Sequence, residues 1–398
     1  MKILHTADWH LGCSLGAEKR FEEHDALLDH FCKIIKENNI EAVIIAGDVF
    51  DMALPPNRAA EQYYRFLLEA ERAGARDIIV IGGNHDSASY LEAPKDILKY
   101  LSVHVFATAS QECSDMIIEL KNADGTVAAL VGAVPYLHEK DILKFESGQG
   151  VSERETALRN AVLAYYHKMA DALNARSASV PHIVTGHLFA ADSGRKNDSW
   201  IGTLMSISTA DLPPSIDYVA LGHLHDADTL KTPHDSCVRY PGAPLNVSFR
   251  ELEKAKTVTV IDTDDIKNIR ELPLPSFQDM RVLRGSREEL ESMLIKLAGE
   301  ADHSVWCKVE NTGEYAPGLW GNLNILVKNS KVKIIHCVNS KSNPEVIERM
   351  PQERHLADLS AVEVFKLMLK ENGISDETAD YLLAAFNEIE TTVNEDGE

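Results

Sequence analysis

The feature that most constrains the fold is a repeated pattern in which a short apolar run of strand length ends in nitrogen or oxygen donors. In "VALGHLH" (219–225), the apolar run ends at Gly222 and is followed by His223 and His225. Residues i and i+2 of an extended chain point to the same side, so the two imidazoles can face one point. The pattern recurs in "KILHTADWH" (2–10), "AVIIAGDVFD" (42–51), "IIVIGGNHD" (78–86) and "HIVTGHL" (182–188).

Five donor-bearing strand ends indicate one shared site, because sites in open α/β sheets form outside the carboxyl ends of the strands. In four of the five, a glycine directly precedes the first donor, which lets the chain turn sharply and brings backbone close to the site. The pooled donors are Asp8, His10, Asp48, Asn84, His85, His187, His223 and His225.

This donor set predicts a pair of metal ions. Mixed carboxylate, amide and imidazole ligands suit Mn²⁺ or Fe²⁺, and zinc less exclusively. The donors are too many for one tetrahedral ion, but they suit two ions that share a bridging carboxylate, the usual arrangement for displacement at phosphorus. A single such motif is most often an ordinary turn, and the metal interpretation depends on the joint, ordered pattern. Asp51 and Asp86 fit better as loop-capping or ligand-orienting groups than as ligands.

The secondary-structure pattern predicts an α/β fold. Up to about residue 272, apolar strand-like runs alternate with segments of helical period, which is typical of layered sheets covered by helices. We expect helices at 21–38, 59–73 and 90–101, and a further helix that begins at the capping-box pair Ser152 and Glu155. After residue 225 the pattern favours strands, at 237–249 and 256–264.

Three regions are expected along the chain: a core at 1–272, a small α+β domain at 273–340, and a polar linker with two C-terminal helices at 341–398. The segment "ELPLPSF" (271–277) is typical of a linker. In the small domain we expect strands at 280–284, 303–310 and 331–338, a helix capped by Ser286 and Glu289, and a short helix at 317–329. The tail helices are expected at 360–371 and 375–390.

Composition restricts the substrate and the compartment. The formal net charge of −22 argues against binding of nucleic acid by the chain's own overall charge, so a phosphate substrate would need cations or a positively charged partner. Six cysteines without a CxxC pair favour reduced thiols. No stretch approaches the ~18 consecutive apolar residues of a membrane span, and the start of the chain has no signal-peptide pattern. We therefore expect a cytoplasmic protein.

The ordered motifs resemble those of the calcineurin-like metallophosphoesterases. The segments "HTADWHLG", "GDVFDMALPP", "GGNHDS", "VPYL", "DYVALGHLH" and "YPGAPLNVSF" together resemble the SbcD family, the nuclease subunits of bacterial SbcCD DNA-repair complexes, over nearly the whole chain. Many phosphoesterases share such motifs, and "HTADWHLG" and "YPGAPLNVSF" are the two segments that narrow the resemblance to this family. The resemblance implies a four-layer αββα sandwich with a small α+β capping domain and C-terminal helices.

The resemblance also implies roles for individual residues. Asp8, His10 and His225 would bind one Mn²⁺; Asn84, His187 and His223 would bind the other; and Asp48 would bridge them. His85 would be catalytic, either contacting the scissile phosphate or protonating the leaving oxygen. The implied activities are a 3′–5′ exonuclease on duplex DNA ends and an endonuclease on hairpins and single strands, in repair and recombination.

The implied partners are the SbcC ATPase, docked on the C-terminal helices, and a second copy of the chain within a nucleoid-associated heterotetramer. The two copies are expected to meet through the helices near 59–73 and 90–101. The apolar residues Tyr63, Tyr64, Phe66, Leu67 and Leu68 could form the dimer surface or could equally be core. Candidate DNA contacts, which could equally be ordinary solvated groups, are Lys19, Arg20, Arg58, Arg195 and Lys196.

Two other functions remain open. A small-molecule phosphomonoesterase or phosphodiesterase could use the same core, but it leaves residues 273–398 unexplained. A non-catalytic scaffold with a relic site is disfavoured, because every expected ligand is present together with His85.

Overall fold

The computed structural model of the chain describes residues 1–143, 151–192, 206–339 and 383. Internal contacts divide the chain into two compact units, Met1–Gln278 and Asp279–Glu398. No helix in the described parts is long and apolar enough to cross a membrane.

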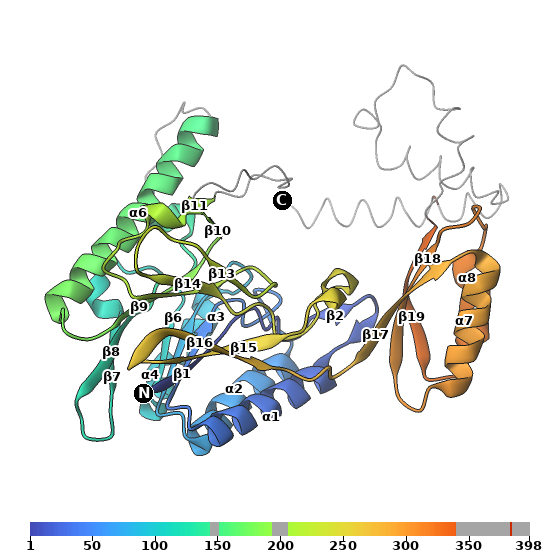
Figure 1. Ribbon diagram of the computed structural model, residues 1–398, viewed down its shortest axis with the longest axis horizontal. Coiled ribbons are helices and arrows are strands. Elements are labelled where there is room, and N and C mark those ends of the chain that lie inside the picture. Colours follow the sequence, from blue (N-terminus) through green and yellow to red (C-terminus); the bar gives the residue numbers. More distant parts are fainter. Residues whose placement is uncertain (144–150, 193–205, 340–382, 384–398) are drawn as a thin grey trace. The chain divides into compact units, whose positions relative to one another are not determined.

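The first unit contains two six-stranded mixed sheets (Figure 1). In the first sheet, four adjacent strands run parallel up to one edge, and two antiparallel strands extend the sheet on the other side. Its order is β16 (Asp265–Pro273), β15 (Thr257–Asp262), β1 (Lys2–Thr6), β4 (Ala42–Ala46), β5 (Asp77–Ile81) and β6 (Val103–Phe106).

The second sheet also has a parallel centre, with one antiparallel strand at each edge. Its order is β13 (Asp228–Leu230), β14 (Cys237–Tyr240), β12 (Tyr218–Gly222), β9 (His182–His187), β8 (Val127–Gly132) and β7 (Ile117–Lys121).

The strands are apolar on both faces because each sheet is buried on both sides. In β4, Val43 and Ile45 join a core cluster with the helices α1 (Phe21–Asn38) and α2 (Asn57–Ala73). The alternate residues Ala42 and Ile44 join the cluster that fills the space between the two sheets. The helix α6 (Val151–Arg176) covers the outer face of the second sheet. The result is the expected four-layer αββα sandwich.

Shorter elements complete the first unit. They are β2 (Ser14–Leu15), β3 (Glu18–Lys19), α3 (Ala88–Glu92), α4 (Lys95–Leu98), η1 (Lys99–Leu101), η2 (Cys113–Met116), α5 (Glu139–Ile142), β10 (Ala190–Ala191), β11 (Ile207–Ser208), η3 (Thr209–Asp211) and η4 (Phe249–Glu253).

Several predicted boundaries were wrong. The single helix expected at 90–101 is three short helical turns, and Pro94, which cannot continue a hydrogen-bonded helix, lies between the first two. The strand expected at 237–249 ends at Tyr240, just before Pro241. The segment 271–277, expected to be a linker, begins inside β16, which pairs with β15 as far as Pro273.

The second unit is a small α+β domain. Its parallel sheet has the order β17 (Asp279–Gly285), β18 (Val305–Asn311) and β19 (Val332–Asn339). The helices α7 (Arg287–Glu300) and α8 (Leu319–Val327) share one apolar core with these strands. The predicted capping box is present, with the Ser286 side chain accepting from the Glu289 N–H and Glu289 accepting from the Ser286 N–H. Apart from Leu383, which is helical, the predicted tail helices lie outside the described residues.

Candidate metal centre

All eight predicted donors follow, or end, the central parallel strands of the two sheets. Asp8 and His10 follow β1, Asp48 follows β4, and Asn84 and His85 follow β5. His187 ends β9, while His223 and His225 follow β12. Both sheets therefore contribute donors at the carboxyl ends of their strands, as the sequence pattern predicts.

The backbone around the site is held in conformations that L-residues rarely adopt. Among the described residues only six other than glycine have positive φ, and four of these are predicted ligands: Asp8 (55°), His10 (48°), Asp48 (50°) and His223 (102°). Such strain persists only where surrounding structure enforces it, and it concentrates at functional sites. Here it turns each donor off its strand toward the centre.

The glycines allow these turns to pack against each other. A Cβ on Gly83 would collide with Asp48 Oδ1, and a Cβ on Gly47, whose φ is +87°, would collide with the His187 ring. The expected close approach of backbone to the site is therefore observed.

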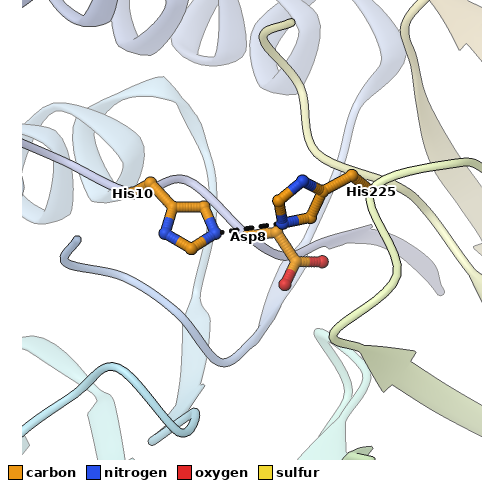
Figure 2. A group of neighbouring side chains, drawn as sticks. All are labelled: Asp8, His10 and His225. Carbon is orange, nitrogen blue, oxygen red and sulfur yellow. Dashed lines mark hydrogen bonds between the residues drawn. The ribbon is translucent and has the colours of Figure 1, made fainter. Parts of the chain in front are cut away.

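One group of donors consists of Asp8, His10 and His225, whose possible ligand atoms lie within 4.8 Å of one another. Figure 2 shows the rings of His10 and His225 facing each other, with Asp8 beside them. The Nε2 atoms of His10 and His225 face each other at 3.2 Å. Two neutral imidazoles in this arrangement can share only one proton, and a cation between them would satisfy both lone pairs. The Asp8 carboxylate also accepts the His223 backbone N–H at 2.9 Å, which ties the two sheets together at the site.

A second group consists of Asn84, His187 and His223. Asn84 Oδ1 lies 3.1 Å from His187 Nε2 and 3.1 Å from His223 Nδ1. His187 Nδ1–H donates to the carbonyl of Ala46 at 2.8 Å, which leaves Nε2 as the atom directed into the site.

Asp48 lies between the two groups. Its Oδ2 is 3.2 Å from His187 Nε2 and 3.8 Å from His10 Nε2, while its Oδ1 accepts the His85 N–H at 3.0 Å. One carboxylate oxygen therefore faces a histidine of each group, which is the position that a bridging ligand requires.

The electrostatics of the site favour a cation. Burial raises the pKa of Asp8. Burial would also raise the pKa of Asp48, but the imidazoles of His187 and His10 outweigh it and hold this pKa below its usual range. Burial alone would lower the pKa of His187, but the Asp48 and Asp8 carboxylates outweigh burial and hold this pKa at about 9. Without a metal ion, a proton on His187 balances the buried carboxylates, and divalent ions would supply this positive charge instead. The donor chemistry and these charges fit a pair of divalent ions.

Two histidines of the site have a carboxylate near the ring nitrogen that does not face the other donors, as metal-binding imidazoles often do. His10 Nδ1 lies 3.5 Å from Asp51 Oδ1, and His225 Nδ1 lies 3.4 Å from Glu251 Oε1. Glu251 is not recognisable from the sequence pattern, because η4 does not follow an apolar strand that ends in donors. Its hydrogen bonds with His225 and Lys256 outweigh burial and lower the pKa of Glu251 to about 2.

Asp86 has the loop-capping role that the sequence favoured. Its carboxylate accepts backbone N–H groups of Gly83, Val49 and Phe50 at 2.9–3.1 Å. These bonds join the loop after β4 to the loop after β5. Burial raises the pKa of Asp86 to about 6, against the effect of these N–H groups.

His85 is in neither of the two groups of donors, although it lies near His10 and Asp51. Its side chain is exposed, its ring lies edge-on to His10 with centroids 5.0 Å apart, and its Nδ1–H donates to the carbonyl of Asp51 at 2.9 Å. Its Nε2 is therefore the ring nitrogen available to a substrate.

The candidate DNA contacts differ in accessibility. Lys19 is exposed, and Arg58 is half exposed but paired with Glu22 and Asp25. Arg20 was predicted wrongly as a surface contact: only 2% of its side chain is exposed, and it forms an ion pair with Glu23. Arg195 and Lys196 lie outside the described residues.

Comparisons with known proteins agree with this geometry. The calcineurin-like phosphoesterase family matches residues 1–227, and the type 5 capsule protein repressor C-terminal domain matches residues 276–372. The SbcD subunit of the nuclease SbcCD from Escherichia coli K12 is 34% identical over 93% of this chain and 92% of its own length. The proteins of the same name from Rhodobacter capsulatus and Bacillus subtilis are 35% identical over 69% of both chains and 33% identical over 66% of both chains. The chain therefore belongs to the SbcD family of nuclease subunits, metal-dependent enzymes of the calcineurin-like phosphoesterase superfamily.

Proposed function

We propose that the chain is a Mn²⁺-dependent DNA nuclease, with a 3′–5′ exonuclease activity on duplex ends and an endonuclease activity on hairpins and single strands. The observation that carries the proposal is the position of Asp48 Oδ2 between His187 and His10. Asp8, His10 and His225 would hold one ion, and Asn84, His187 and His223 the other. Two such ions, when bound, supply positive charge to the phosphate oxygens and lower the pKa of a water molecule.

The chain's own groups would then position the substrate. Asp51 and Glu251 keep the imidazoles of His10 and His225 turned toward the site. His85, with Nδ1–H held by the Asp51 carbonyl, would present Nε2 to the scissile phosphate or to the leaving 3′ oxygen. Lys19 and Arg58 remain candidates to contact the DNA backbone.

The net charge of −22 supports the proposal of a positively charged partner surface. We propose that this partner is an SbcC-type ATPase docked on residues 341–398, since the relatives are named as parts of an SbcCD nuclease. A homodimer within a heterotetramer is also proposed. Tyr63, Phe66 and Leu67 cannot form its surface because they are buried in the core, whereas Ile97 and Tyr100 are exposed. A strictly monomeric sedimentation profile at micromolar concentration would contradict the dimer.

The decisive assay measures cleavage of duplex DNA ends beside hydrolysis of a chromogenic phosphate ester, with Mn²⁺ or Mg²⁺, and with or without the ATPase partner. We expect cleavage of DNA with Mn²⁺ and only weak turnover of the ester. Efficient ester hydrolysis without DNA cleavage under any of these conditions would instead support a small-molecule phosphoesterase.

A further inference from the structure

A pocket of about 250 Å³ opens beside the second group of metal-site donors. One wall consists of Asn84, His187 and His223. The rest of the pocket is almost entirely apolar and is lined by Pro135, Tyr136, Leu137, Leu158, Val162, Leu188 and Phe189. The proposed chemistry uses only the first wall, so the apolar part has no role in it.

Three separate segments build the apolar part: the loop after β8, the helix α6 and the residues that follow β9. Tyr136 connects it to the metal site, because its ring lies edge-on to the His187 ring with centroids 6.3 Å apart. The Tyr136 N–H also donates to the carbonyl of Gly82 at 2.8 Å, which fixes this loop next to the Gly83–Asn84 turn.

The pocket would not repel an anionic substrate. Among the described residues that line it, the only carboxylate is that of Glu139, and Arg154 is paired with this group through two hydrogen bonds of 2.6 Å. The Arg154 guanidinium lowers the pKa of Glu139 and compensates its charge. The space directly beside a substrate phosphate at the metal site is therefore an apolar cavity whose one carboxylate is neutralised by an arginine.

We propose that this pocket receives the nucleobase next to the scissile phosphate, with Tyr136 as the aromatic side chain against which the base packs. The inference rests on the proposed nuclease function and names a determinant of its substrate. A nucleobase is the planar aromatic group that a phosphodiester of DNA carries near its phosphate, and its π-faces, unlike its polar edges, suit an apolar lining. Base–aromatic packing tolerates any sequence, since every base has a π-face, and the apolar lining offers few groups that could distinguish bases.

The proposal has a structural consequence for the substrate. A base that enters a pocket must leave its stack and its pairing partner. Cleavage should therefore be faster where the nucleotide beside the scissile bond is unpaired, as at frayed ends, than at a fully paired position.

The test uses the full chain with its ATPase partner, Mn²⁺ and a labelled single-stranded oligonucleotide in which one abasic residue is placed at successive positions. For the wild type, we expect one position next to the cut to lower kcat/KM about tenfold or more. Tyr136→Ala should lower kcat/KM for the intact oligonucleotide by a similar factor. Removal of the base at that position should then lower kcat/KM of this variant little further. Tyr136→Phe, which keeps the aromatic ring, should show the abasic penalty that Tyr136→Ala loses.

A second pair of variants guards against misfolding of Tyr136→Ala. Leu158→Trp fills the pocket from α6 and should slow the intact oligonucleotide selectively, while Asn160→Trp, exposed on the same helix, should not. Equal abasic penalties in the wild type and Tyr136→Ala, or no penalty in the wild type, would overturn the inference.

Two further outcomes are also informative. If Tyr136→Ala weakens Mn²⁺ binding and slows both substrates equally, Tyr136 only supports His187, and the base pocket is refuted. If the wild type cleaves no oligonucleotide at all, the nuclease proposal fails, and this inference fails with it.

Discussion

At the scale of single residues, the site combines side chains that each need their neighbours in order to act. Asp48 illustrates this, since one oxygen faces His187 and His10 while the other accepts the His85 N–H. Its φ of 50° is maintained by this surrounding structure.

Asp48→Ala should abolish nuclease activity and lower the metal content, because both proposed ions lose a shared ligand. Metal analysis after gel filtration and a DNA cleavage assay measure the two effects. Asp171→Ala, which removes an exposed carboxylate from α6, should leave both unchanged. Two tightly bound ions in Asp48→Ala would contradict the bridging role.

His85→Ala should keep both metal ions and DNA affinity but lower turnover ~10²–10⁴-fold, the usual contribution of an acid–base group. The reason is that the exposed His85 is in neither group of donors, while its Nδ1–H is held by the Asp51 carbonyl. Single-turnover cleavage at increasing Mn²⁺ concentration is the measurement. Recovery of the rate by Mn²⁺ alone would mean that His85 only orients a ligand.

At the scale of elements, the site depends on loops from neighbouring strands that are joined by Asp86. Three backbone N–H groups from the loops after β4 and β5 end on this one carboxylate. The metal-site loops are therefore coupled by a side chain that is not itself in either group of donors.

Asp86→Ala should destabilise the first unit by about 2–5 kcal/mol, since it leaves three buried donors without an acceptor at roughly 1–3 kcal/mol each, partly relieved by water. Mn²⁺ affinity should fall with stability, because Asp48 and Asn84 lie on the two released loops. Thermal unfolding and Mn²⁺ titration measure both effects. Asp96→Ala, at an exposed position paired with Lys99, is the control. Unchanged Mn²⁺ affinity in Asp86→Ala would contradict the coupling of the loops.

Two tail helices are predicted from the sequence at 360–371 and 375–390. Their apolar stripes are Val364, Phe365, Met368 and Leu369, and Leu382, Ala385, Phe386 and Ile389. Deletion of 356–398 should leave a folded protein that no longer co-purifies with an SbcC-type ATPase. Deletion of only the acidic residues 394–398 should not affect co-purification. Retained binding after the longer deletion would refute the docking assignment.

At the scale of the whole molecule, the sequence predicted the metal site better than it predicted the boundaries of elements. Strand ends, glycines and donors are local signals, and parallel strands bring their carboxyl ends together without further information. Glu251 and the pocket at Tyr136 were missed because they depend on which segments pack together. Pro94 interrupts the segment expected to be one helix, and this proline is a signal in the sequence that favours two shorter helices.

The buried histidines of the first unit predict how its stability depends on pH. Burial and nearby Arg239 lower the pKa of His5 to about 3, and burial and nearby Arg20 lower that of His24 to about 4. Both are neutral in the folded protein: His5 Nε2–H donates to the Leu221 carbonyl and His24 Nε2–H to the Trp9 carbonyl. In the unfolded chain each would take up a proton near its ordinary pKa of 6.5.

Between pH 6.5 and about 4 the unfolded chain therefore binds more protons than the folded protein, so stability falls as the pH falls. Each histidine contributes about 1.4 kcal/mol per pH unit to this slope. Urea unfolding of metal-free protein at about pH 7, 6 and 5 measures this slope. His24→Gln should remove the contribution of one histidine to the slope. His167→Gln, at an exposed position of α6, should leave the slope unchanged. An identical slope in His24→Gln and the wild type would mean that His24 is protonated in the folded protein. Its burial beside the Arg20 guanidinium argues against this, because both lower the pKa of His24.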